Sequence, residues 1–249
     1  MIEEKIKESS SKLFAPLLVV FAASLWAVDG IVLRPSLYSL PVPLVVFIES
    51  AVVAILLTPF FIKRFSSLKQ LKKKDWLAFF GVALLGGAVG TMAITKALFY
   101  VNFINLSVVI LLQKLQPVFA ISLATIFLKE KLPKEFFLWA GLAILGAYFM
   151  TFGFSSPNFS TGDKTTIAAL FALLAAFSFS SSTVLSKRAL RNVDYEMGTY
   201  LRFLFATIIM LMIAGTTGDI SNISEITTKQ IIVFIIIAFT TGGAAIFLY

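Results

Sequence analysis

The chain contains neither cysteine nor histidine, and only 14% of its 249 residues carry a charge. The first two absences exclude disulfides, thiolate nucleophiles, imidazole bases and imidazole metal ligands within these residues. Soluble domains have about 25% charged residues, so water is not the main solvent of this fold. The composition gives no reason to expect a catalytic residue, a metal or a cofactor, and the protein is not expected to be an enzyme.

Long apolar runs dominate what is present, with 59% hydrophobic residues and a mean hydropathy of +0.94. A transmembrane helix needs about 20 mostly apolar residues. Such runs can only be helices, because hydrocarbon offers no partners to backbone polar groups. The sequence therefore predicts an all-α, polytopic bundle of transmembrane helices. Eight windows qualify: 14–34, 43–62, 76–98, 103–128, 136–154, 166–186, 197–214 and 230–249.

The basic residues fall mostly on one side of these windows. If the N-terminus is cytoplasmic, fifteen of the 21 Lys and Arg lie in inside segments, and only Arg34, Lys164 and Lys229 lie outside. This bias predicts a multi-pass protein of the cell (inner or plasma) membrane with a cytoplasmic N-terminus. It accounts for the net charge of +8 without a nucleic-acid partner, and leaves membrane lipid as the surrounding partner.

The two halves of the chain show weak internal similarity. A shift of 153 residues places Ala22–Arg34 over Ala175–Lys187 and Glu49 over Arg202, and three inserted residues align Gly86-Gly87 with Gly242-Gly243. We interpret residues 14–154 as a first repeat of five helices and 166–249 as a second repeat with three. A repeat of five helices must return inverted, as in many secondary transporters. Chance likeness between apolar helices is the alternative.

The chain stops inside an apolar run, "FTTGGAAIFLY". We therefore expect the second repeat to be incomplete, with about eight of ten helices present.

The sequence resembles the EamA-type family of the drug/metabolite transporter superfamily. The resemblance rests on "SLWAVDGIVLR", "KALFYVNFINLSVV", "LQKLQPVFAISLATIFLKEKL" with Pro117 and Glu130, and "GLAILGAYFM". It implies a ten-helix bundle with cytoplasmic termini that moves small metabolites, often amino acids, commonly as export driven by proton exchange or a gradient. One position departs from the family, because Glu49 stands where an arginine is common, whereas the second copy keeps Arg202.

Apart from Arg34, which ends the first window and is counted with the outside segment, five charged residues lie inside the windows: Asp29, Glu49, Lys96, Lys114 and Arg202. A charge at the bilayer centre costs about 2.5–3.5 kcal/mol on insertion scales, so each is a candidate for substrate binding or coupling. Glu49 is either a proton-binding carboxylate or partner of a substrate ammonium, or one half of a buried salt bridge to Lys96 or Lys114. Lys96 and Asp29 lie toward span ends, where they can also reach the headgroups.

The fourth window has a polar centre. Gln113 and Gln116 share a helix face beside Lys114, and are expected to line a pore or to bond another helix. Pro117 predicts a kink that either frees carbonyls toward the path or only serves packing. Trp26 either stacks on substrate or is a buried aromatic.

Glycines mark the third window and its counterpart, at Gly86, Gly87, Gly90, Gly242 and Gly243. Small residues let helices approach closely in lipid, either for tight packing or for rocking between repeats.

These features predict a secondary transporter of small metabolites such as amino acids or drug-like compounds, an exporter or permease working by alternating access, with the proton as a possible coupling ion. We expect a monomer or a homodimer. Two alternatives remain: an intramembrane lipid-modifying enzyme, for which paired carboxylate motifs are absent, and a non-transporting receptor subunit, for which the loops are short.

Overall fold

A computed structural model describes residues 17–62, 65, 68–69, 71–101, 106–129, 131–133, 135–154, 164–191 and 193–244. This described part is helical and contains no strand, as the sequence predicts. The first span, Leu17–Leu37, ends in two short segments, η1 (Asp29–Leu33) and η2 (Arg34–Leu37). The remaining elements are α2 (Val42–Phe61), α3 (Lys73–Val82), η4 (Ala83–Val89), α4 (Gly90–Val101), α5 (Leu106–Gln113), α6 (Gln116–Leu128), α7 (Glu135–Phe152), α8 (Lys164–Ala189), α9 (Tyr195–Thr216), η5 (Asp219–Glu225), α10 (Thr228–Ile237) and η6 (Ala238–Ala244).

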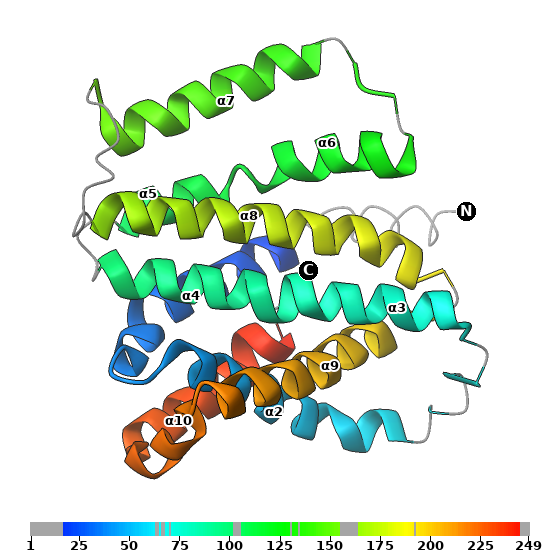
Figure 1. Ribbon diagram of the computed structural model, residues 1–249, viewed down its shortest axis with the longest axis vertical. Coiled ribbons are helices and arrows are strands. Elements are labelled where there is room, and N and C mark those ends of the chain that lie inside the picture. Colours follow the sequence, from blue (N-terminus) through cyan, green and yellow to red (C-terminus); the bar gives the residue numbers. More distant parts are fainter. Residues whose placement is uncertain are drawn as a thin grey trace, which may run out of the picture.

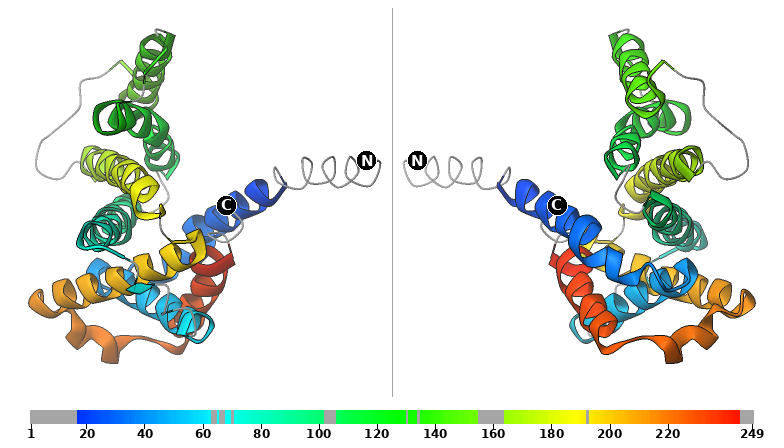
Figure 2. Two further views of the ribbon diagram at one scale, coloured as in Figure 1. Left: turned by 90° about the vertical axis from the view of Figure 1, so that its right-hand side faces the viewer. Right: turned by 90° about the vertical axis from the view of Figure 1, so that its left-hand side faces the viewer.

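The helices lie in successive layers (Figure 1). The order runs from α7 through α5–α6, α8 and α3–α4 to a group that holds α9, α2 and α10. Figure 2 shows the same molecule from the side, where the first span and η6 lie together in the group that contains α2 and α9. The α5–α6 layer and α2 are therefore separated by two layers of helix.

The central helix α8 packs closely because its buried face is built from small residues. Ala168, Ala172, Ala175 and Ala176 are each fully buried. Side chains without branches let two backbones approach in lipid, where no water drives apolar association. Two serines of the same helix bond across it: Ser180 donates to the Gln116 carbonyl at 2.7 Å, and Ser182 to the Val82 carbonyl at 3.1 Å. The serines of α8 thus hydrogen-bond to the neighbouring layers.

The outer faces are apolar. On α7, Phe137, Leu138 and Trp139 are 69%, 62% and 65% exposed. Such continuous exposed apolar surface is tolerable in lipid and not in water. By length and composition, six helices of the described residues can cross a membrane, or seven if the bent pair of η5 with Thr228–Gly242 counts as one span.

All eight predicted windows contain helices of the described residues, and the last of them differs from a simple span. The window 136–154 contains α7, which is 18 residues long. The last window contains α10 and η6, preceded by η5 at an angle of 114°. Residues 245–249 of that window, and Glu130, lie outside the described residues.

Four spans contain a wide turn or a break. The segments η1, η4 and η6 are π-helical, with the η4 glycines and Gly242 and Gly243 inside two of them. The fourth span is interrupted between α5 and α6 at Lys114 and Leu115, and Pro117 stands in the first turn of α6. A proline fits there because the first amides of a helix have no intrahelical partner. Wide turns of this kind are frequent at functional sites.

Candidate functional site

A buried ion cluster joins the first span to α2. The Arg34 guanidinium lies 2.7 Å from Asp29 Oδ2 through Nη2, and 3.2 Å from Glu49 Oε1 through Nη1. Asp29, Arg34 and Glu49 are 6%, 8% and 8% exposed. One cation therefore holds two carboxylates away from solvent.

Local backbone geometry brings Asp29 and Arg34 together. The Arg34 amide donates to the Asp29 carbonyl, five residues earlier, which closes the wide turn of η1. Pro35 then lies in the first turn of η2, at a position that needs no amide hydrogen. The turn allows both side chains to face α2.

Two threonines complete the cluster from other elements. Arg34 Nη1 also donates to Thr95 Oγ1 of α4 at 3.0 Å. Thr241 Oγ1 of η6 lies 3.5 Å from Asp29 Oδ2 and 3.1 Å from the Ile237 carbonyl, so its single hydrogen is shared. Asp29 Oδ1 and Glu49 Oε1 are buried and accept no hydrogen bond from the described residues. The cluster connects elements from both halves of the chain.

The predicted partners of Glu49 were wrong. Neither Lys96 nor Lys114 pairs with it among the described ion pairs, and Arg34 does. Lys96 is exposed, with Nζ 5.3 Å from the centre of the Phe171 ring. Lys114 is exposed at the break between α5 and α6. Both ammonium groups thus lie away from the ion cluster.

Arg202 lies apart from the cluster, on α9. Its Nη2 donates to the Gly86 carbonyl at 3.3 Å, and its guanidinium carbon is 5.9 Å from the Phe203 ring centre. Its Nε is buried without a hydrogen-bond acceptor in the described part of the chain. The closest approach of η4 to α8 is beside it, because a Cβ on Gly86 would collide with the Ser182 hydroxyl.

The other glycines also lie at close contacts. A Cβ on Gly87 would be 2.6 Å from Ala206 Cβ, one on Gly90 would be 3.0 Å from Phe179 Cε1 of α8, and one on Gly242 would collide with Val53. Gly243 lies in η6, and its surroundings are outside the described side chains. These glycines are therefore required by packing between helices.

The residues predicted to bind substrate or coupling ion do not line one shared cavity. Gln113, Lys114 and Gln116 belong to the α5–α6 layer, beyond α8 and α3–α4 from Glu49 (Figure 1). Trp26 is 41% exposed on the first span. The structure brings together Asp29 and Glu49, and leaves the other candidates elsewhere.

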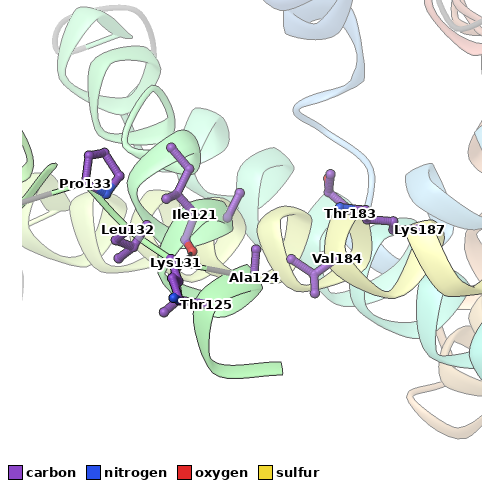
Figure 3. Close-up of a pocket in the computed structure, with 10 residues that line it drawn as sticks. Ile121, Ala124, Thr125, Lys131, Leu132, Pro133, Thr183, Val184 and Lys187 are labelled. Carbon is purple, nitrogen blue, oxygen red and sulfur yellow. Dashed lines mark hydrogen bonds between the residues drawn. The ribbon is translucent and has the colours of Figure 1, made fainter. Parts of the chain in front are cut away.

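Two surface grooves contain none of the predicted residues. One, of about 370 Å³, lies between α6, residues 131–133 and α8, with Lys131 and Lys187 among its lining residues (Figure 3). The other, of about 530 Å³, is lined by Lys73, Trp76, Leu77, Phe80 and Phe205. No group of three or more Asp or Glu in the described ranges could hold a metal ion.

Residues 13–152 and 166–249 match the EamA-like transporter family. The chain belongs to this family. Its relatives include the riboflavin transporter ImpX of Fusobacterium nucleatum subsp. nucleatum, 48% identical over 234 residues, which are 94% of this chain and 78% of that protein. An uncharacterized transporter of Synechocystis sp. is 28% identical over 153 residues, which are 59% of this chain and 42% of that protein. No solved structure matches.

Membership in this family, together with the apolar helices, makes the EamA-like chain a multi-pass membrane transporter of a small molecule. Sequence reasoning missed Arg34, Thr95 and Thr241 as members of the cluster. Arg34 was assigned to an outside loop because it ends the first window. No signal in the sequence indicated this pair, because side chains three or four residues apart are neighbours on a regular α-helix and those five apart are not.

Proposed function

We propose that this EamA-like protein carries riboflavin, or a closely related flavin, across a membrane by alternating access. The observation that carries the proposal is the 48% identity to a riboflavin transporter along 94% of the chain. Identity spread over nearly all of the described helices supports a shared ligand better than a short match would. The proposal replaces amino acids and drug-like compounds as the substrates to test first.

Mirrored helix contacts support two inverted repeats as the moving parts. Gly87 of η4, in the first half, packs against Ala206 of α9, in the second. Gly242 of η6, in the second half, packs against Val53 of α2, in the first. Val53 and Ala206 are separated by the same 153 residues as the repeat. Each third span thus contacts the second span of the other half, at equivalent residues of the second spans and at glycines of the third spans that lie one residue apart in the alignment.

The polar groups of the two halves are related by the same shift of 153 residues. The repeat pairs Asp29 with Ser182 and Glu49 with Arg202. Asp29 lies beside η6, through Thr241, and is joined to Glu49 by Arg34, whereas Ser182 and Arg202 lie beside η4, at Gly86. Substrate and ion sites of inverted-repeat transporters lie near the interface of the repeats, which supports a functional role for these two polar places.

The distribution of basic residues supports a cytoplasmic N-terminus in the cell membrane. The start of α3 and the ends of α6 and α8 lie at one end of the layers, the right-hand end in Figure 1. Lys131 and Lys187 line one groove there. Collection of lysines on one side is what the positive-inside rule requires.

Riboflavin flux into sealed vesicles tests the proposal. The full-length protein is reconstituted, and labelled riboflavin is measured inside the vesicles against protein-free vesicles and against labelled amino acids. We expect saturable riboflavin flux that unlabelled riboflavin suppresses and amino acids do not. Amino-acid flux without riboflavin flux would overturn the assignment of substrate.

A further inference from the structure

We infer that the Asp29–Arg34–Glu49 cluster is a binding site for one proton, held on Glu49 and exchanged during transport. This inference rests on the proposed transport function and adds a coupling ion to it. It begins from the charge of the cluster. Two carboxylates share one guanidinium, so the ionised cluster carries one uncompensated negative charge.

An uncompensated charge buried among helices is expensive, and groups in that situation become neutral instead. Arg34 cannot supply a second positive charge, and arginine does not lose its proton in proteins. The least costly remedy is one bound proton. The cluster is then neutral while Arg34 keeps its ion pair with Asp29.

The distances assign the proton to Glu49. Asp29 Oδ2 is 2.7 Å from Arg34 Nη2, a length typical of a charge-assisted hydrogen bond. Glu49 is held more loosely, with its two oxygens 3.2 and 3.5 Å from Nη1. Each carboxylate has one oxygen, Asp29 Oδ1 or Glu49 Oε1, without a hydrogen bond from the described residues, so the distances to Arg34 are what distinguish the two. Protonation of the loosely held carboxylate therefore loses the least attraction.

The surrounding groups do not change the net charge of the cluster. Thr95 of α4 and Thr241 of η6 are neutral, and Lys96 of α4 is exposed beside Phe171. Arg202 of α9 is bound to the Gly86 carbonyl, and Lys229 of α10 is exposed. Burial raises the pKa of the Tyr38 phenol, which follows η2, so this group stays neutral at pH 7. No second cation among the described residues meets the two carboxylates.

The same geometry favours a proton over a metal cation. Hard metal cations take six or more oxygen ligands in open coordination. Here the guanidinium fills the space between the carboxylates, and only two threonine hydroxyls accompany them. A proton needs neither space nor a coordination shell.

Proton binding would also change a contact between the two halves. Ionised Glu49 attracts Arg34, and Arg34 fixes Asp29, which is approached by Thr241 of η6. Neutral Glu49 releases part of the hold on Arg34. The proton thereby acts on the interface of α2, the first span and η6, where movement of one repeat against the other must occur.

Infrared spectroscopy of the full-length protein tests the site without any substrate. We expect, at neutral pH, the carbonyl band of a protonated carboxylic acid that shifts in heavy water, is absent in Glu49→Gln and persists in Glu225→Gln. Glu225 is an exposed carboxylate on η5 and serves as the matched control. If Glu49→Gln does not fold, isotope labelling of glutamate carboxyls must shift the band in the unmodified protein. Absence of the band, or a shift with labelled aspartate instead, would overturn the inference.

Flux measurements test the exchange. A pH gradient should accelerate riboflavin flux several-fold in the unmodified protein and in Glu225→Gln. In Glu49→Gln, the acceleration of riboflavin flux by the gradient should be lost. Indifference of the unmodified protein to the gradient would overturn coupling. Absence of riboflavin flux would overturn the proposed substrate, and the infrared result would still decide the proton site.

Discussion

At the scale of single residues, Arg34 is the side chain on which the ion cluster depends. Removing one member of a buried ion pair leaves a charge without compensation and costs about 3–5 kcal/mol. We expect Arg34→Gln to lower the free energy of unfolding in detergent by about that amount. Denaturant titration followed by helical circular dichroism measures it.

Neutralising the carboxylates as well should restore stability. The triple variant with Arg34→Gln, Asp29→Asn and Glu49→Gln retains the shapes of the two carboxylate side chains and removes every charge of the cluster. Its free energy of unfolding should recover most of the loss. A triple variant as unstable as Arg34→Gln would show that shape, and not charge, holds the cluster together.

Gly87 offers a second test at this scale, because a single added methyl group would disturb its close contact with α9. The added Cβ of Gly87→Ala would lie 2.6 Å from Ala206 Cβ, so a helix must shift. Overpacking of this kind costs about 1–3 kcal/mol. Gly146→Ala on α7 is the matched control, since nothing lies within 4 Å of its Cβ. Thermal unfolding in detergent should separate the two variants, and equal melting temperatures would contradict the close contact.

At the scale of helices, proline follows a break in the fourth span but lies inside a continuous helix in α2. The span breaks at Lys114 and Leu115 before Pro117, whereas α2 runs through Pro59 near its end. We expect Pro117→Ala to join α5 and α6 into one helix and to lower riboflavin flux several-fold, because the joint between two packed segments is lost. Pro59→Ala should leave flux unchanged. Flux assays in vesicles, with amide exchange at residues 113–118, measure both effects.

Helix positions were predictable from the sequence because the bilayer fixes their length and composition. Their interruptions were less predictable. Gly86 and Gly87 indicated close packing, but neither the π-turn around them nor their neighbours Ser182 and Ala206, which are distant in sequence. Likewise Pro117 predicted a kink but not a full interruption of the helix. Ser180, which donates a hydrogen bond to the Gln116 carbonyl beside the interruption, comes from α8.

At the scale of the whole molecule, the sequence could predict that charges inside helices deserve attention, but not which of them meet. Asp29 and Glu49 converge because the first span and α2 are neighbours in the fold. Lys114 and Glu49 do not, because two helix layers separate their spans (Figure 1). A window count carries no information on lateral order, since apolar helices can be arranged in many ways in lipid.

Alternating access makes a last prediction for the two mirrored polar places. The 249-residue chain has no cysteine, so every thiol in it can be an introduced one. Thr241→Cys reports on the place beside Asp29, and Ser182→Cys on the place beside Gly86. If the repeats rock against each other, riboflavin should raise the rate at which a membrane-impermeant maleimide labels one of these thiols, and lower it for the other.

The comparison needs a control thiol whose exposure does not change during transport. Glu225→Cys is exposed on η5 and should react at the same rate with and without riboflavin. Labelling is followed by gel shift in sealed vesicles of one orientation. Ser182 and Thr241 are only 6% and 7% exposed, so either thiol can react only in a conformation that opens its side. Parallel changes at both thiols would mean that the halves open together, and inverted repeats moving in opposition would then be the wrong description of this transporter.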